Sequence, residues 1–309
     1  MANGSIRAGD ETRFITTSDD PAELVNFGIG DLRLGVEAQS GSLISRGRVI
    51  LLDLATVEGT IQSGAEVLLG TGATVSGAIS QNADISLPPF PSIDNEWPAT
   101  SQGSVLLKAG DTQLIEPGAF DLVRVPPNAT LVLESGTYYF DSLDVRPRAV
   151  VRAEGEVTIE VRTGAVLRSS FVDEGGGIVP VTLRYRGLAP LGLVSAFDGS
   201  VLAPKADLSI GSGHARSFTG MFYAKTIDVR PGVTVRLGQP ATIMSFSFKS
   251  GRIDADSANS PNEASAYGTC SFSPGRMNST GGLCCALMVL FLVRRRKISS
   301  NGASVRRYD

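Results

Sequence analysis

Short groups of apolar residues, separated by glycines, recur between Leu51 and Leu87. A three-residue phrase, Ala followed by a polar residue and then Val or Ile, begins at Ala55, Ala65, Ala73 and Ala83. Its starts are about 10, 8 and 10 residues apart, so two phrases make a unit of roughly 18 residues. Each such unit must stack on the next to bury its apolar side. The pattern predicts a parallel β-solenoid.

A longer repeat follows in the second half of the chain. Residues 136–152 align without gaps on residues 220–236, and both contain a Gly turn, an aromatic-rich strand, an Asp-Val pair and a Pro corner. Further copies of the short phrase begin at Ala149, Ala165 and Ala206. We therefore predict an all-β fold, a right-handed parallel β-helix with about 18 residues per coil, followed by a polar linker and a short C-terminal apolar helix.

The β-helix is predicted to cover residues 31–248. Residues 1–30 are polar and mixed, and we expect them to form an N-terminal cap with a short helix from Pro21, because an open coil end leaves strand groups unpaired. The Pro-rich residues 86–103 cannot supply continuous ladder donors. They are predicted to form an extended loop insertion along the solenoid wall, held by Phe90 or Trp97.

The C-terminal residues differ in character from the rest. Residues 249–282 are rich in Ser, Asn, Gly and Ala, which is typical of a flexible linker. Residues 283–297 combine an unbroken apolar run with an Arg/Lys stop, and residues 298–309 form a polar tail. As a helix, the apolar run would reach only ~16 Å against a hydrocarbon core of ~30 Å.

Composition narrows the chemistry. The net charge of -3 argues against general nucleic-acid binding. The three Cys residues all lie within the last 40 residues and provide neither a disulfide framework nor a zinc spacing for the main domain, so we expect no cofactor. The first residues lack the apolar core of a signal peptide, so no export signal is visible.

Residues 105–236 resemble a widespread group of bacterial surface β-helix domains of largely unassigned function. The residues that carry the resemblance are Pro117–Phe120, Gly136–Phe140, Val157–Val161, Val201–Ala206 and Gly220–Lys225. The unit at residues 49–85 is similar to the polymer-forming repeats of bactofilins. These resemblances imply a solenoid fold and a structural role.

The tail resembles the C-terminal sorting tails of myxobacterial surface proteins. The matching features are Cys270, a spacer at 281–282, the apolar run and a basic cluster of Arg294, Arg295 and Arg296. That resemblance implies processing near the Cys and a protein of the cell envelope or surface, anchored to the membrane through its C-terminal segment.

Carboxylates and aromatic residues at repeat positions are the candidate surface contacts. Asp141, Asp144 and Asp228 could serve a polysaccharide-cleaving site, or they could be solvated or structural. Asp144 and Asp228 occupy the same repeat position, which favours a structural role such as a corner hydrogen bond. Tyr139 and Tyr223 also match, and could bind sugars or stack along the core.

The sequence as a whole favours a non-enzymatic structural or adhesive protein that displays a rigid β-helix on a tether. The alternative is a carbohydrate-binding or polysaccharide-cleaving β-helix protein, because solenoids host both classes. The expected partners are a second copy through the coil ends, cell-surface polysaccharide, and the membrane through the C-terminal segment. No nucleic-acid partner is expected.

Overall fold

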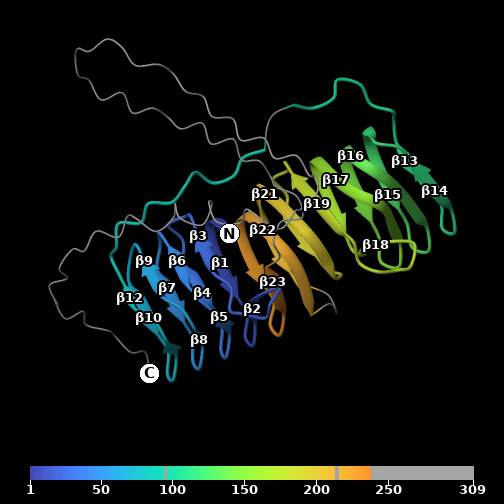
Figure 1. Cartoon of the computed structure of the whole chain (residues 1–309). Coiled ribbons are helices and arrows are strands. Elements are labelled where there is room, and N and C mark those ends of the chain that lie inside the picture. The colour runs from blue at the N-terminus through green and yellow to red at the C-terminus, as the bar shows by residue number, and fades with distance from the viewer. Residues whose placement is uncertain (94–95, 213–215, 238–309) are drawn as a thin grey trace, which may run out of the picture. The chain divides into compact units, whose positions relative to one another are not determined.

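The computed structural model describes residues 1–93, 96–212 and 216–237. These residues form an all-β parallel solenoid of about 12 turns (Figure 1). No helix occurs among them, so the short helix expected from Pro21 is not formed, and β3 begins at Leu24 instead. The predicted linker, apolar helix and polar tail at 249–309 lie outside the described residues.

Residues 1–80 form what we call the first half-solenoid, which is built from very short strands. Val49 pairs with Val67, Thr56 with Thr74 and Ile61 with Ile79, which confirms the 18-residue unit. The strands are β1 (Ala2–Ala8), β2 (Arg13–Thr16), β3 (Leu24–Asn26), β4 (Leu32–Leu34), β5 (Gln39–Ser40), β6 (Leu43–Ser45), β7 (Val49–Leu51), β8 (Thr56–Val57), β9 (Ile61–Ser63), β10 (Val67–Leu69), β11 (Thr74–Val75) and β12 (Ile79–Ser80).

Residues 105–237 form the second half-solenoid, in which several strands are long and bend around a corner. These strands are β13 (Val105–Leu106), β14 (Thr112–Ile115), β15 (Gly118–Val125), β16 (Thr130–Val145), β17 (Val150–Leu167), β18 (Phe171–Val172), β19 (Pro180–Tyr185), β20 (Leu191–Leu193), β21 (Phe197–Ile210), β22 (Ser217–Val229) and β23 (Thr234–Leu237). Residues 81–104, which we call the strap, connect β12 to β13.

The coils are stacked in an order that differs from their order in the chain. Strand β1 pairs in parallel with β22 on one side and with β3 and β4 on the other, and β2 pairs with β23 and with β5. The stack therefore runs through residues 105–237 and then through residues 1–80. Its two outer ends are β13–β14 and β10–β12. The order of the coils in the stack is thus a circular permutation of their order in the chain.

This order overturns the expectation that residues 1–30 cap the solenoid. They instead supply the coil at which the two half-solenoids meet, with ladder partners on both sides. The apolar residues Ile6, Ala8 and Phe14 are buried on the inward side of these strands. The polar residues of the segment take the outward-facing strand positions. A strand with alternating polar and apolar residues can have the same composition as a capping segment, so composition does not distinguish the two.

The core continues without interruption through the permutation point. One ladder of inward side chains is in register from one end of the stack to the other, and every member is buried. It consists of Val105, Val123, Leu143, Ala165, Leu191, Leu208, Ile227, Ile6, Leu32, Val49 and Val67. Ala165 and Leu191 are matched through the pairing of Leu167 with Leu193, two residues further along both strands. Burying a side chain of this size contributes about 1.5–3 kcal/mol relative to exposure.

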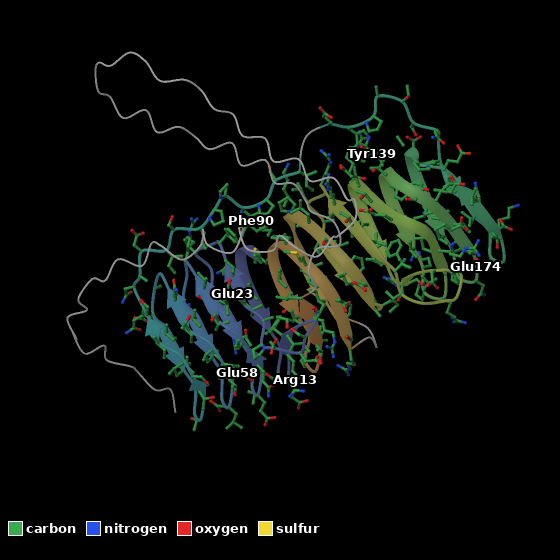
Figure 2. The ribbon with its side chains drawn as sticks, in the orientation of Figure 1. Arg13, Glu23, Glu58, Phe90, Tyr139 and Glu174 are labelled. Carbon is green, nitrogen blue, oxygen red and sulfur yellow. The ribbon has the colours of Figure 1, made fainter. Side chains whose placement is uncertain are left out.

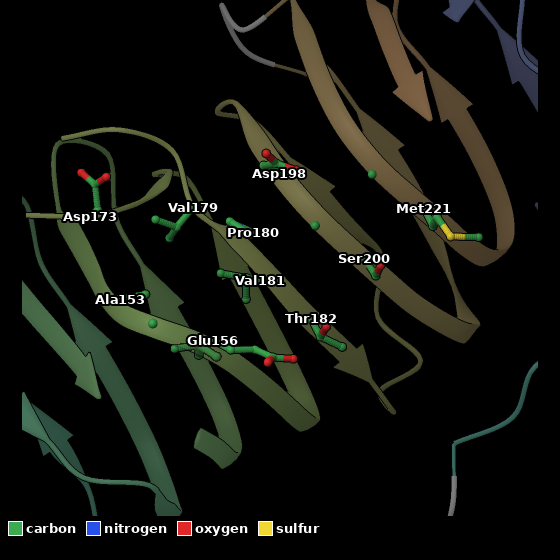
Figure 3. Close-up of a pocket in the computed structure, with 14 residues that line it drawn as sticks. Ala153, Glu156, Asp173, Val179, Pro180, Val181, Thr182, Asp198, Ser200 and Met221 are labelled. Carbon is green, nitrogen blue, oxygen red and sulfur yellow. The ribbon is translucent and has the colours of Figure 1, made fainter. Parts of the chain in front are cut away.

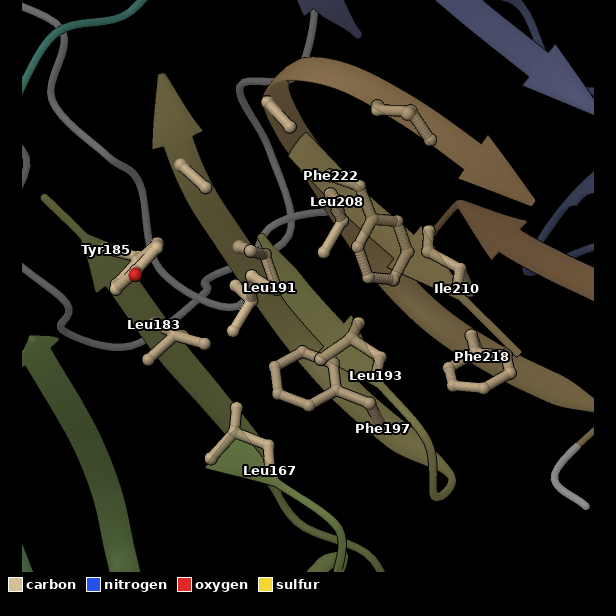
Figure 4. Close-up of a cluster of buried hydrophobic side chains, with 14 of the residues drawn as sticks. Leu167, Leu183, Tyr185, Leu191, Leu193, Phe197, Leu208, Ile210, Phe218 and Phe222 are labelled. Atoms are coloured by element: carbon tan, nitrogen blue, oxygen red, sulfur yellow. The ribbon is translucent and has the colours of Figure 1, made fainter. Parts of the chain in front are cut away.

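Aromatic side chains fill the wider interior of the second half-solenoid (Figure 4). Phe197 packs against Phe171 and Phe222, with ring centroids 6.4 and 6.3 Å apart. Tyr138 is fully buried, and its hydroxyl donates towards the carbonyl oxygens of Ile115 and Glu134, at 3.0 Å each. Burial raises the pKa of Tyr138 to about 12.

A glycine corner allows adjacent coils to approach closely in the second half-solenoid. Gly199 and Gly220 are paired in register and have φ angles of 126° and 136°. A Cβ atom on Gly220 would overlap the carbonyl oxygen of Gly199, and one on Gly199 would overlap the carbonyl oxygen of Val181. Only glycine combines this backbone conformation with this contact.

The glycine corner gives a stability prediction. Gly220→Ala should lower the free energy of unfolding by roughly 1–3 kcal/mol from backbone strain alone, with a further loss from the backbone overlap. Gly192→Ala is the matched control in a neighbouring strand, because its Cβ would meet only Ser212 Oγ at 3.7 Å. Urea unfolding measures both, and equal midpoints for the two variants would contradict the prediction.

Candidate functional site

The strap crosses the outside of the stack from β12 to β13 (Figure 1). When fully extended, residues 81–104 can span an end-to-end distance of roughly 80 Å. A stack of about 12 turns, with turns ~4.8 Å apart, is roughly 55 Å long. The strap therefore spans the stack without strain. Its described residues, 81–93 and 96–104, form no strand, as the Pro-rich sequence predicted.

The strap runs over one outward-facing ladder of the second half-solenoid. Members of this ladder point away from the core, but Glu160, Leu202 and Tyr223 are only 4%, 2% and 5% exposed. In register, it consists of Ala119, Tyr139, Glu160, Arg184, Leu202 and Tyr223. Figure 2 shows Phe90 of the strap and Tyr139 on the same side of the stack.

Trp97 is one of the two aromatic anchors of the strap. Its ring lies edge-on to Tyr139, with centroids 5.4 Å apart. The guanidinium groups of Arg162 and Arg186 lie 5.1 and 5.6 Å from the Trp97 ring. Arg162 is held in turn by Asp141, at 2.6 Å. Two cation–π contacts and an aromatic pair together fix this side chain on the wall.

Glu160 is the buried carboxylate beneath this anchor. It pairs with Arg186 at 2.5 Å and with Arg184 at 3.2 Å. Arg186 also donates to the main-chain oxygen of Glu96 in the strap, at 3.1 Å. A buried carboxylate left without its cations would be strongly unfavourable, so these arginines and Glu160 depend on one another.

Phe90 is the second anchor, and it touches both half-solenoids. Its ring lies edge-on to Phe27 of the first half at 5.3 Å and to Tyr223 of the second half at 6.3 Å. Burial raises the pKa of the Tyr223 phenol. Tyr139 and Tyr223, which the sequence offered as sugar contacts or core residues, thus face outward but lie against the strap.

The repeat-equivalent acids lie in ion pairs with arginine. Asp144 is buried and pairs with Arg146 at 2.9 Å and with Arg124 of the preceding coil at 3.3 Å. Asp228 pairs with Arg230 at 3.6 Å. This geometry agrees with the structural reading of the repeated Asp-Val-Arg-Pro corner. Whether these residues also contact a partner stays a prediction.

A groove lies on the wall of the second half-solenoid (Figure 3). Its volume is about 360 Å³, and residues of β17, β19, β21 and β22 line it, with the glycine corner among them. Its lining includes the acidic residues Glu156, Asp173 and Asp198 and the hydroxyl-bearing residues Thr182 and Ser200. Among the described residues, no Lys or Arg lines it, and burial raises the pKa of Asp198.

The groove contains none of the five candidate contact residues that sequence reasoning chose. The repeated Gly turn of the sequence contributes Gly220 to the lining, and Asp173 lies in an acidic, Gly-rich loop. Asp198 follows no repeated motif. Carboxylates and hydroxyls of this kind can hydrogen-bond the hydroxyl groups of a sugar. Among the described residues, no group of three or more His, Cys, Asp or Glu side chains is placed to hold a metal ion.

Comparisons with protein-family models, with curated proteins and with solved structures find no match to this chain. The resemblances to bactofilin repeats and to sorting tails therefore stay predictions, and Cys270 and Arg294–Arg296 lie outside the described residues. Within the part of the chain that the structure describes, no helix is long and apolar enough to cross a membrane.

The anchoring role of Trp97 can be tested by removing its side chain. Trp97→Ala should lower the free energy of unfolding by about 1–3 kcal/mol, because the aromatic and cation–π contacts are lost together. It should also make the strap more sensitive to limited proteolysis. Ile29→Ala, at a residue 90% exposed, is the control. A strap as protected as in the unmodified chain would contradict this role.

Proposed function

We propose that this chain is a non-enzymatic structural or adhesive protein of the cell envelope, assembled through its coil ends and tethered by its C-terminal segment. The observation that supports assembly is the pair of ladder edges that have no further strand on their outer side. Among the described residues, β10–β12 pair only with β7–β9, and β13 and β14 pair only with β15 and β16. Unpaired parallel edges are templates for another chain.

Apolar side chains accompany both edges. Ile79 is 39% exposed at one end, and Leu106 and Leu114 are 57% and 50% exposed at the other. The strap covers only part of each end. At one end the Val67 main-chain N–H donates to Gln81 Oε1 at 3.4 Å, and at the other Gln102 donates its main-chain N–H to the carbonyl oxygen of Ala119 at 2.8 Å. The edges of β13 and β14 remain open in the described part of the chain.

The two ends are complementary in direction. Every ladder in the stack is parallel. The unpaired main-chain N–H and C=O groups of the β10–β12 end in one copy can therefore pair with those of the β13–β14 end in the next copy. Such a head-to-tail contact does not close on itself, so it generates a filament. The proposed tail, with Cys270 and the basic residues at 294–296, would attach the assembly to the membrane.

End-to-end assembly predicts a position-specific effect of charge. Leu114→Lys and Ile79→Lys should each abolish concentration-dependent assembly in sedimentation and in negative-stain images, because a charge would be desolvated at the contact. Leu188→Lys is the matched control, since Leu188 is 77% exposed but lies between β19 and β20, away from both ends. Short particles at all concentrations for the unmodified chain would refute the proposal.

The groove supports a second candidate function, the binding of a carbohydrate. Its acidic and hydroxyl-bearing residues suit neutral or amine-bearing sugars, whereas an anionic polysaccharide would meet acidic residues with no Lys or Arg among the described lining. The groove runs across several coils, so a chain of sugar units could contact successive rungs. This function would use Asp198 and its neighbours instead of the coil ends.

Carbohydrate binding predicts retention of the chain on neutral or amino-sugar polysaccharides. Asp198→Asn combined with Glu156→Gln should weaken that binding at least tenfold if the carboxylates accept sugar hydroxyl groups. Glu58→Gln, on the first half-solenoid, is the control. Retention that is unchanged in the double variant would exclude the groove, and release of shortened polysaccharide would instead indicate a polysaccharide-cleaving enzyme.

A further inference from the structure

The step between the two half-solenoids is the one place where consecutive coils are not consecutive in the chain. Elsewhere in the described stack, the chain continues from each coil into its neighbour. Here the β22–β23 coil meets the β1–β2 coil through hydrogen bonds and packing alone. The main-chain bonds include Gly9 to Val229 at 2.7 Å, Gly232 to Asp10 at 2.8 Å and Arg13 to Val233 at 3.0 Å. We call this step the junction.

Packing at the junction leaves space. A cavity of about 100 Å³ is lined from the first half by Ile6, Phe14 and Leu24, and from the second half by residues that include Phe222 and Ile227. The Glu23 carboxylate also lines this mainly apolar cavity, and burial raises its pKa. Incomplete packing between the two halves and a partly desolvated carboxylate both weaken the interface.

Each half-solenoid keeps its own ladders when the junction opens. In the first half, residues of β1 remain paired with β3 and β4, and β2 remains paired with β5. In the second half, β22 remains paired with β21 and with β23. Opening therefore exposes one edge on each half, and these two edges are complementary to each other.

We propose that the junction also forms between copies, so that residues 1–80 of one molecule complete residues 105–237 of a second. The contacts are identical to those of the closed molecule, so exchange costs no enthalpy of pairing. Tethering by the strap favours the closed form at low concentration, whereas a high concentration during folding favours exchange.

The strap is long enough for this exchange. In the closed form it needs roughly 55 Å of its roughly 80 Å reach. In an exchanged pair it would connect the end of one stack to the opposite end of a neighbouring stack. Phe90, which contacts Phe27 and Tyr223 on the two sides of the junction, would be released and would bind again in the new pair.

Single cysteines on the two sides of the junction test the proposal in the full-length chain. Ser5 and Thr226 are register partners across it, and neighbouring strand residues are close enough for a disulfide. In a background with Cys270→Ser, Cys284→Ser and Cys285→Ser, one copy carries Ser5→Cys and a second, mass-tagged copy carries Thr226→Cys. The two are unfolded together, refolded at increasing concentration and oxidised.

The proposal predicts a mixed disulfide of doubled mass, whose yield rises with concentration during refolding. The matched control mixes Thr56→Cys with Thr74→Cys copies, because these partners both belong to the first half and stay within one molecule after exchange. One chain that carries both Ser5→Cys and Thr226→Cys confirms that the pair can link. If that chain does not form the disulfide, Ile15→Cys and Arg236→Cys replace the first pair, because Ile15 and Arg236 are also partners across the junction.

A yield of mixed disulfide no greater than that of the control mixture would overturn the exchange. Repeating the experiment with Leu114→Lys in every copy separates exchange from end-to-end assembly, because Leu114 lies at a coil end, away from the junction. Cross-linking that persists in this background supports exchange even if the filaments are lost. Cross-linking that disappears with the filaments would refute exchange.

Discussion

Each strand in this solenoid depends on main-chain hydrogen bonds to the coils before and after it, because most strands are too short to be stable alone. That dependence explains why the N-terminal residues cannot be a free-standing cap. A strand such as β1 gains a full set of partners only by lying between β22 and β4. The same requirement leaves edges at the two outer ends of the described stack, and the strap joins those ends covalently without covering all of their ladder groups.

The strap changes the chemistry of the wall that it crosses. In an open solenoid, the outward positions of a strand would be solvated. Here Glu160 is 4% exposed and needs two arginines, and Tyr223 is 5% exposed and lies against Phe90. The arginine-rich composition of this region therefore has a structural use, since guanidinium groups can pair with carboxylates and stack on Trp97 at the same time.

Much of the fold could be predicted from the sequence, because a repeat encodes both the coil length and the inward positions. The equivalence of Thr56 with Thr74, and the expectation that Phe90 or Trp97 holds an extended loop, follow from local patterns. The permutation could not be predicted. Whether β1 pairs with β22 depends on strand edges that are far apart in the chain, since Met1 and Phe222 are separated by 221 residues. A parallel ladder has no residue code for its partner. The groove was missed because Asp173 and Asp198 converge only after the coils stack.

The permuted order also sets the timing of folding during synthesis. Residues 1–80 leave the ribosome first, but the ladder edge of β1 and β2 has to wait for residues 217–237. At about 5–20 residues per second, that interval is on the order of 10 to 30 s. During this interval the nascent chain carries an unpaired strand edge, which a nascent chain on a neighbouring ribosome of the same messenger RNA could occupy. The spacing of ribosomes on the messenger RNA therefore affects how this protein folds.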